Sequence, residues 1–514
     1  MSWLDNMMRD MINAPARHIW VHHGLPPDDT ERLHLSNNPE PSLDSCFKLG
    51  TAAQTSVGLS ALAASRFHAL RTDIEGSVRV DSRHALIEFA GERYYTIDGQ
   101  LPEMFEDDEL TDQYVTKDGG MVRLNMNFPH HKEGLLKILG CEADKATITA
   151  VMAEQDSSEF IDKVMKAELV ATDLHSFDTI DATSHGRSTV NISPVSITKI
   201  GEAPRRSIEG VGEPEYALEG IRVLDLTRII AGPVAARTLA AHGADVLHVS
   251  APHLPAVPKF DVETTRCKRT TQLDLNKPEE KATLEELVKD ADVFLQSYAP
   301  KALEKRGFGA KAVAEMRPGI VYASLTALAH TAVYWDRRAY NFCVEMLEGL
   351  QVQEAETYKE WLVANDKDAS QVPRYKPLPM RAISHLAGQL LAFGIEAALC
   401  KTITEGGTWE VHVSLESVAL WLRAMGSLTP EEAYDEGEPL PERTFPLAEE
   451  VAGYSITVER DDGDVDSPDT EQPTGSTMTV IRHAAEMEAT RIKEGKAPMR
   501  LNAHKPEWLP RPAA

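Results

Sequence analysis

Residues 218–250 read LEGIRVLDLTRIIAGPVAARTLAAHGADVLHVS, and this stretch decides the fold. The run IRVLDL is almost continuously apolar, which is typical of a parallel strand buried on both faces. A turn at Gly232 and Pro233 follows, and proline suits the first turn of the alanine-rich helix VAARTLAAHG. The run ADVLHVS then predicts a second buried strand. The stretch therefore predicts one strand–helix–strand unit.

The same alternation continues toward the C-terminus. A helix is predicted over 278–290, the strand DVFLQS follows it, a helix is predicted near 301–316, and GIVYASL is a further strand. This order predicts an α/β fold, with a doubly wound, Rossmann-like parallel sheet in a lobe that spans 218–425. Ligands of such sheets bind beyond the carboxyl ends of the strands. The predicted rim comprises residues 227–232, 250–253, 297–299 and 324–327.

Ahead of this lobe, residues 1–44 predict a polar N-terminal extension, and residues 45–200 predict a first, smaller α+β lobe. In that lobe YVTKDGGMVRLNM predicts a β-hairpin, because two alternating runs flank the turn residues KDGG. Residues 201–217 lack periodicity and contain glycine and proline, so we expect a linker. Residues 426–514 form a C-terminal segment. Its acidic stretch 459–476 is expected to be disordered, because it carries too little apolar surface to fold.

The composition narrows the choice of partners. Lys and Arg number 53 against 80 Asp and Glu, which gives a formal net charge of −27. This excess argues against nucleic acid or an anionic membrane as the main partner. The N-terminus lacks a signal-peptide pattern, no run of 18 apolar residues is present, and the five cysteines have no CxxC spacing. A cytoplasmic protein is therefore expected.

The fingerprints of common nucleotide and metal sites are missing. No GxGxxG follows the first strand and no GxxxxGK[ST] occurs in the chain, which disfavours a dinucleotide oxidoreductase or a P-loop enzyme. The histidine pairs His22–His23 and His130–His131, together with His330, lack acidic partners at metal-ligand spacing. No metal site is predicted.

The stretch 218–250 resembles the opening of the class III (CaiB/BaiF) CoA-transferases, a family related to formyl-CoA transferases and α-methylacyl-CoA racemases. The resemblance continues in the family's order through CKRTTQLDL, DADVFLQSYAPKALEKRGF, RPGIVYASLTALAH and LLAFGIEAALCKTITEGGTWEVHVSL, and covers residues 218–420. Residues 50–81 also resemble residues 386–415. The chain therefore looks like a long, rearranged version of the family, with a diverged partial copy in its first lobe.

The resemblance implies transfer of CoA between an acyl-CoA and a carboxylic acid, with coenzyme A as substrate and no metal. It also implies a homodimer, although the partial copy leaves a self-contained pseudo-dimer open. The positions that match CoA-contacting residues of the family are Ile229, Ile230, Lys268, Arg269, Ser297, Tyr298, Lys305, Arg338 and Tyr340.

These positions match different parts of the CoA molecule. Ile229 and Ile230 match the thioester end, and Lys268 and Arg269 match a basic pair near the nucleotide. Ser297 and Tyr298 match neighbours of the adenine and ribose, Lys305 matches a basic position, and Arg338 and Tyr340 match the pantetheine mouth. Gathered at the predicted rim of an acidic protein, the cations predict a phosphate pocket.

One position departs from the family pattern. The resemblance places the family's catalytic aspartate at Ser384, in the string PLPMRAISHLAGQLLAFG. A serine cannot form the acyl anhydride or the aspartyl thioester of the family mechanism. Ser384 is either only the N-cap of the following helix, a role that Ser and Asp share, or an N-cap with altered chemistry. His385 is no ready base for it, because adjacent residues on a helix point about 100° apart.

Three functions therefore stay open: a CoA-transferase, a non-catalytic or rewired acyl-CoA-binding protein, and an acyl-CoA racemase or isomerase. The racemase branch uses a histidine and an aspartate as its proton-transfer groups. This chain has Tyr340 and Ser384 at those positions, which disfavours racemisation. CoA transfer is the leading prediction.

Overall fold

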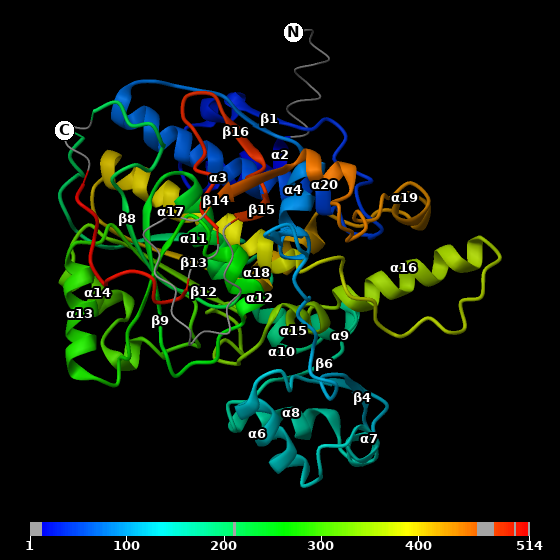
Figure 1. Ribbon diagram of the computed structural model, residues 1–514. Coiled ribbons are helices and arrows are strands. Elements are labelled where there is room, and N and C mark those ends of the chain that lie inside the picture. The colour runs from blue at the N-terminus through cyan, green and yellow to red at the C-terminus, as the bar shows by residue number, and fades with distance from the viewer. Residues whose placement is uncertain (1–12, 209–211, 460–476, 498–499, 512–514) are drawn as a thin grey trace.

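The computed structural model describes residues 13–208, 212–459, 477–497 and 500–511. Residues 1–12, residues 209–211 and almost all of the stretch predicted to be disordered, 459–476, lie outside the described residues. Figure 1 shows a large body that contains the central sheet and, below it, a smaller lobe.

The central sheet has seven strands in the order β10-β9-β8-β11-β12-β13-β7. Six of them are parallel. Counted along the chain from β8, they follow the order 3-2-1-4-5-6 of dinucleotide-binding sheets. β7 joins β13 antiparallel at one edge. The predicted α/β, Rossmann-like fold is confirmed. The strands are β7 (Ser196–Gly201), β8 (Arg222–Leu226), β9 (Asp245–Ser250), β10 (Arg269–Gln272), β11 (Val293–Gln296), β12 (Val321–Thr326) and β13 (Thr408–Ser414).

The sequence pattern does not predict β10 as a strand, because its residues RTTQ form no apolar run. The strand is covered by the C-terminal tail rather than by an apolar layer. The Thr270 N–H donates to His504 Nδ1 at 3.1 Å, and its hydroxyl donates to the Arg500 carbonyl. Polar residues therefore suit this edge of the sheet.

Alternate residues of the strands face two layers of helices. Val223 and Leu295 belong to a core that includes residues of α11 (Ala231–Ala241) and α17 (Ala382–Thr404). Their neighbours Leu224 and Phe294 belong to a second core with α13 (Pro278–Lys289) and α14 (Ala310–Met316). This alternation is the two-residue period of a strand buried on both faces.

Two long buried helices, α3 (Leu49–Thr72) and α17, pack against each other at the centre of the body. Ser60 Oγ on α3 donates to Glu396 Oε2 on α17 at 2.7 Å, and Glu396 Oε1 lies 2.6 Å from His242 Nδ1. By length and composition α17 could cross a membrane, but its apolar window is wholly buried inside the protein. It therefore serves as a core helix of the fold.

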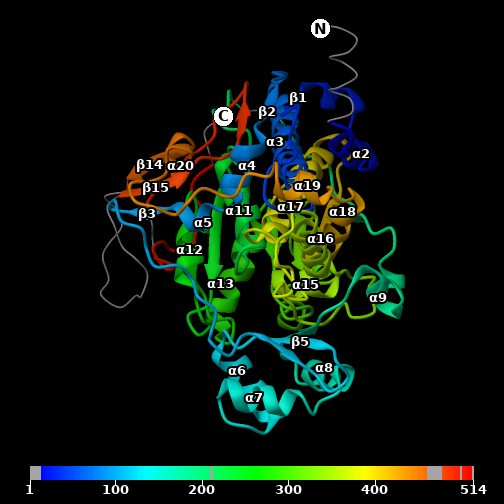
Figure 2. The same ribbon diagram turned by 90° about the vertical axis from the view of Figure 1, so that its right-hand side faces the viewer.

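The smaller lobe has its own sheet and core. Figures 1 and 2 show it below the large body. β4 (Gln113–Val115) and β5 (Met121–Leu124) form the predicted hairpin, and β6 (Ala171–Asp173) extends it. The helices α6 (Pro129–Leu139), α7 (Lys145–Met152) and α8 (Ser157–Lys166) cover the sheet with Leu135, Ile148 and Phe160. This unit is called the small lobe below.

Two further sheets join distant parts of the chain. β1 (Leu33–Leu35), β2 (Val78–Val80) and β16 (Ala485–Met487) form one, and β3 (Thr96–Ile97), β15 (Thr477–Ile481) and β14 (Ser455–Glu459) form the other. β7 likewise brings a segment from before the expected linker into the central sheet. The division at residues 44, 200, 217 and 425 stays a prediction, and in space these ranges are interleaved.

The remaining helices connect and cover these sheets. They are α2 (Ala14–His22), η1 (Pro27–Arg32), α4 (Ser82–Phe89), α5 (Gly91–Tyr94), α9 (Phe177–Asp181), α10 (Ser184–Ser188), α12 (Pro258–Thr264), η2 (Glu304–Arg306), α15 (Asn341–Leu347), α16 (Leu350–Ala364), α18 (Leu415–Ala424), α19 (Pro430–Tyr434) and α20 (Glu449–Gly453).

Candidate active site

The carboxyl ends of β8 and β11 lie side by side where the strand order reverses, which is the ligand crevice of such sheets. Ser297 ties the two strand ends together. Its hydroxyl donates to the Arg228 carbonyl at 2.7 Å and accepts from the Arg228 N–H at 2.9 Å. This pair of hydrogen bonds holds the loop that leads into α11. Ile229 and Ile230 lie half-buried on this loop.

A glycine makes this turn possible. A Cβ atom on Gly232 would lie 2.7 Å from Thr227 Cβ and 2.9 Å from Ser297 Oγ. Only a residue without a side chain allows the start of α11 to approach the two strand ends so closely. The Gly-Pro turn of the quoted stretch is therefore a packing requirement at the rim.

Lys268 lies beneath this rim rather than on it. Its Nζ is fully buried, 3.0 Å from Asp225 Oδ2, and it donates to the Pro233 carbonyl at 2.9 Å. Burial alone would raise the pKa of Asp225, but Lys268 and His248 hold it well below its usual range. Burial lowers the pKa of Lys268, and Asp225 opposes that shift. In this structure Lys268 forms a structural ion pair with Asp225 that supports the loop.

Arg269 and Lys305 do not lie with the other predicted residues at the rim either. Arg269 begins β10 at the amino end of the sheet, where it pairs with Asp245 at 2.9 Å and donates to the Glu507 carbonyl at 2.8 Å. Lys305 is exposed on η2, after β11. The basic pair expected near the nucleotide is thus divided between a buried site and the opposite end of the sheet.

Arg228, Arg338 and Tyr340 meet where the small lobe adjoins the rim. The Tyr340 ring lies 6.1 Å from the Phe128 ring and 6.5 Å from the His131 ring of the small lobe. Burial raises the pKa of the Tyr340 phenol to about 12, and both arginines lie close enough to oppose this rise. Burial lowers the pKa of His130, and the same two arginines lower it further. Arg228 and Arg338 therefore share one positively charged neighbourhood.

Arg228 is also a neighbour of Tyr298. Burial raises the pKa of the Tyr298 phenol, and the charge of Arg228 opposes the shift. The Tyr298 ring packs at the edge of the second core. Of the predicted positions, the structure therefore gathers seven at the carboxyl ends of the strands or beside them: Ile229, Ile230, Ser297, Tyr298, Arg338, Tyr340 and Ser384.

Ser384 lies in the first turn of α17, not at its N-cap. The N-cap residue is Arg381, and it makes no side-chain capping bond. The Ser384 N–H donates to Asn341 Oδ1 at 2.8 Å and also to the Arg381 carbonyl at 3.0 Å, so an amide from α15 adds a partner in the first turn. The N-cap prediction for Ser384 is wrong by three residues. Its side chain is almost completely buried, with 5% exposed.

The start of α17 touches the rim directly. A Cβ atom on Gly388 would lie 2.7 Å from the Ala231 carbonyl oxygen, so α17 crosses the start of α11 one turn beyond Ser384. Asn341 follows Tyr340 in the chain. The contact of Gly388 with Ala231 and the hydrogen bond of Ser384 to Asn341 place Ser384 between the Ile229–Ile230 loop and Tyr340.

His385 points away from Ser384, as predicted. Its Nε2 lies 3.3 Å from Glu92 Oε2, and its ring stacks on Phe89 at 5.3 Å. Burial would raise the pKa of Glu92, but His385 and Arg381 together lower it to about 2. His385 therefore belongs to an ion-pair cluster and makes no dyad with the serine.

Two pockets open along the sheet beyond this crevice. One, of about 660 Å³, lies at the carboxyl ends of β11 and β12, between Gln296, Ser324 and Thr326, and is bordered by Lys301 and Lys311. The other, of about 570 Å³, lies along β13 and β7. Both reach His330 and Glu410. The first pocket coincides with part of the predicted rim.

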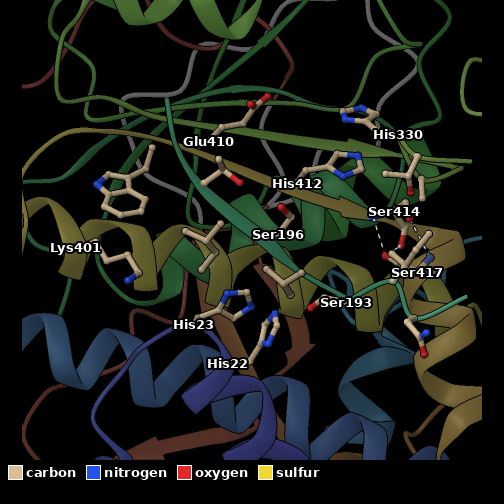
Figure 3. Close-up of a pocket in the computed structure, with 18 residues that line it drawn as sticks. His22, His23, Ser193, Ser196, His330, Lys401, Glu410, His412, Ser414 and Ser417 are labelled. Carbon is tan, nitrogen blue, oxygen red and sulfur yellow. Dashed lines mark hydrogen bonds between the residues drawn. The ribbon is translucent and has the colours of Figure 1, made fainter. Parts of the chain in front are cut away.

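Histidines line the second pocket, as Figure 3 shows. His22 ends α2 and His23 follows it, whereas His330 stacks on His412 with ring centroids 3.7 Å apart. Burial lowers the pKa of His23 to about 4, and burial with the neighbouring His330 lowers that of His412 to about 3. These two imidazoles are therefore neutral near pH 7.

Among the residues that the structure describes, one group has the spacing of metal ligands: His185, Glu348 and Glu416. His185 Nε2 lies only 2.5 Å from Glu416 Oε1, whereas ligands of one zinc ion lie about 3 Å or more apart. Burial would lower the pKa of His185, but the two glutamates raise it to about 9. A buried ion-pair cluster explains this geometry without a metal.

Comparison with known proteins now identifies the region that builds the rim. Residues 218–452 match the model of CoA-transferase family III. This part of the chain belongs to CoA-transferase family III. The match includes every predicted site residue, from Ile229 to Ser384. The predicted class III resemblance is confirmed.

Named relatives of this chain are CoA-transferases. A probable fatty acyl-CoA transferase of Mycobacterium tuberculosis, Rv3272, is 26% identical over 264 residues, 48% of this chain and 63% of the relative. A formyl-CoA:oxalate CoA-transferase of Streptomyces coelicolor is 35% identical over 144 residues, 26% of this chain and 35% of the relative. The chain thus spans less than two thirds of the length of these relatives. A crystal structure of Rv3272 is similar with 26% identity and a TM-score of 0.35, covering 41% of this chain and 59% of that one.

Sequence reasoning missed three residues of the family III region that shape the site. Arg228 stands inside the quoted stretch, but a single arginine does not differ from a surface charge in a sequence. Asn341 contacts Ser384 across 43 positions, and no local pattern signals such a contact. Glu345, on the same helix as Asn341, is treated below.

Proposed function

We propose that this protein transfers CoA between an acyl-CoA and a carboxylic acid at the carboxyl edge of its central sheet. The observation that carries the proposal is that the family III match, residues 218–452, includes both strands of the crevice, β8 and β11, and every predicted site residue. Similar proteins include a formyl-CoA:oxalate CoA-transferase and a succinyl-CoA:glutarate CoA-transferase. The acyl group used by this chain is left to experiment.

The rim has chemistry suited to both substrates. The pocket at the ends of β11 and β12 has the size of a ligand site, and Lys301 and Lys311 offer cations for the phosphates of CoA. Arg228 and Arg338 offer guanidinium groups near Tyr340, where a carboxylate can be bound. CoA and an acid would then meet at the carboxyl edge of the sheet.

The test is a panel of acyl-CoAs (formyl, acetyl, butyryl and succinyl) combined with free acids (oxalate, glutarate, succinate and benzoate) and read by mass spectrometry. We expect an acid-dependent loss of one acyl-CoA together with the appearance of the CoA thioester of the added acid. Each acyl-CoA without acid serves as the control. Hydrolysis to free CoA without a new thioester, or no reaction, would contradict the proposal.

A second function, acyl-CoA binding without turnover, is favoured by one observation. Within the described residues the structure shows no hydrogen bond from the Ser384 hydroxyl to a base, and His385 faces Glu92 instead. Binding of CoA in calorimetry, together with no turnover of any pair in the panel, would favour this function. Racemisation has no comparable support, because the buried Tyr340 phenol has a pKa of about 12.

We propose further that the protein is a cytoplasmic homodimer that needs no metal. Its five cysteines are unpaired, which suits a reducing compartment. The homodimer follows from the family expectation. Size-exclusion chromatography with light scattering tests the dimer, since a mass near 56.7 kDa would contradict it. Metal analysis of the purified protein tests the last point.

A further inference from the structure

Carboxylates close to the first turn of α17 are already engaged by the protein. Glu92 places Oε1 3.3 Å from Arg381 Nη1 and Oε2 3.3 Å from His385 Nε2. Glu345 accepts from Asn341 Nδ2 at 2.6 Å and from Gln351 Nε2 at 2.9 Å. All four oxygens therefore face internal partners rather than a substrate.

Glu345 is also fixed by its surroundings. Its side chain is buried, and burial raises its pKa to about 7. Asn341 lies between it and Ser384, with Nδ2 directed to the carboxylate and Oδ1 to the Ser384 N–H. The amide separates the carboxyl group from the rim, so Glu345 cannot act as a nucleophile without breaking both bonds of Asn341.

The Ser384 hydroxyl is not activated either. An alcohol becomes a useful nucleophile only when an adjacent base accepts its proton. His385 faces Glu92, the amide of Asn341 is occupied, and the Tyr340 phenol keeps its proton near pH 7. None of these groups is therefore an activated nucleophile for an acyl-CoA.

The two arginines, in contrast, are available to a bound anion. Arg338 pairs with Glu168 at 2.9 Å, but the Glu168 side chain is 72% exposed, and a pair of this kind adds little stability. The guanidinium of Arg228 donates to the Pro255 carbonyl, and within the described residues no carboxylate forms a salt bridge with it. Within the described residues neither arginine forms a salt bridge with a buried carboxylate, so each can bind an anion at the rim.

We propose that the acceptor acid binds to Arg228 and Arg338 while acyl-CoA is still present, and that its own carboxylate attacks the thioester. This inference rests on the proposed CoA transfer. A carboxylate oxygen bonds to the thioester carbon, the C–S bond breaks, and CoA leaves as the thiolate with the electron pair. The thiolate then attacks the acceptor's carbonyl carbon in the resulting mixed anhydride. The donor acid leaves as a carboxylate, so atoms and charge balance without a covalent enzyme intermediate.

The first arm of the test is intact-protein mass spectrometry after incubation with acetyl-CoA or succinyl-CoA alone. We expect no mass increase of an acyl group or of CoA, and no change on adding hydroxylamine. With the active pair from the panel, initial rates plotted for both substrates should give intersecting lines. A covalent adduct formed before acid is added, or parallel lines, would overturn the inference while leaving CoA transfer intact.

The second arm follows oxygen. In a single turnover with excess protein and an acceptor labelled with ¹⁸O in its carboxylate, the released donor acid should carry one ¹⁸O. An enzyme carboxylate acting as nucleophile would instead give unlabelled donor acid in the first turnover, which would contradict the inference. If the panel shows no CoA transfer at all, the proposed function fails, and this inference fails with it.

Variants of the small-lobe contact complete the test. Arg338→Ala should raise the KM for the acceptor acid about 10-fold, because a charge-assisted bond is lost, while the KM for acyl-CoA changes less than about 2-fold. Glu168→Gln is the matched control. It removes the competing carboxylate and should leave the acceptor KM equal or lower. Equal effects of Arg338→Ala on both KM values would contradict the assignment of this arginine to the acid.

Discussion

The two long helices at the centre of the molecule begin in different ways. In α3 the N-cap residue is Lys48, without a side-chain capping bond, and the Thr51 N–H donates to Glu40 Oε1 at 2.8 Å. In α17 the N-cap residue is Arg381, again without a capping bond, and the Ser384 N–H donates to Asn341 Oδ1 at 2.8 Å. One helix is capped by a carboxylate from outside, and the other by a neutral amide.

Below, the start of α3 is called the closed end, and the start of α17, which adjoins the rim, is called the open end. At α3 a Cβ atom on Gly50 would collide with the Pro39 carbonyl oxygen, so the chain itself fills the space before the helix. At α17 the first turns contact the rim instead, through Gly388 at the Ala231 carbonyl oxygen and through Asn341, the residue after Tyr340. Negative charge is stabilised near a helix N-terminus. At α3 the carboxyl group beside the first turn is that of Glu40, whereas at α17 the group in this place is the neutral amide of Asn341.

The largest effect is expected beneath the open end, at the buried pair of Lys268 and Asp225. Lys268→Met leaves the Asp225 carboxylate buried without its main partner, and should lower the free energy of unfolding by about 3–5 kcal/mol. Urea denaturation monitored by circular dichroism measures this change. The control is Lys305→Met, which removes an exposed cation and should change stability by less than about 0.5 kcal/mol. Equal effects would mean that Lys268 is not a structural residue.

A substitution that adds a methyl group at the closed end tests whether that end is already filled. Gly50→Ala should lower the free energy of unfolding by about 1–3 kcal/mol, because the added methyl group meets backbone of residue 39 and the side chain of Ser42. Gly212→Ala is the matched control, since nothing lies within 4 Å of its Cβ position. If Gly50→Ala proves as stable as the control, the α3 end is not closed.

The carboxylate at the closed end predicts a pH dependence. Burial raises the pKa of Glu40 to about 7, above its value of 4.5 in the unfolded chain. The folded protein therefore binds more protons than the unfolded chain between these values, so this group's stabilising contribution is present below pH 4.5 and is lost as pH rises toward 7. Glu40→Gln should reduce the fall in stability between pH 4.5 and 7, measured by urea denaturation at several pH values. A variant with the same slope as wild type would contradict the shift.

The smallest effect is expected at Ser384 itself. Because its hydroxyl makes no capping bond, Ser384→Ala should change the free energy of unfolding by less than about 0.5 kcal/mol. Asn341→Ala should cost more, about 1 kcal/mol, because it removes the amide that accepts from the Ser384 N–H. Thermal unfolding of the two variants decides between them, and a larger loss for Ser384→Ala would restore serine as the cap.

Part of the fold and of the candidate site could be predicted from the sequence, and part could not. The apolar runs of β8, β9, β11 and β12 predicted the sheet and its rim, because burial on both faces leaves a local signature. Lys268 and Arg269 looked like one basic pair, but neighbouring residues of an extended chain point to opposite sides. That rule could have placed one of them inside. The contact of Ser384 with Asn341 had no local signature, because it joins two helices far apart in the chain.

The comparison of α3 with α17 depends on the claim that CoA binds at the carboxyl edge of the central sheet. Calorimetric titration of CoA into wild type and into the Lys301→Ala/Lys311→Ala variant tests it most directly, because these lysines border the rim pocket. The control variant Lys137→Ala/Lys359→Ala removes two exposed lysines on α6 and α16. We predict micromolar binding to wild type and control, and at least about 10-fold weaker binding to the pocket variant. No binding by wild type, or equal binding by all three proteins, would contradict the account.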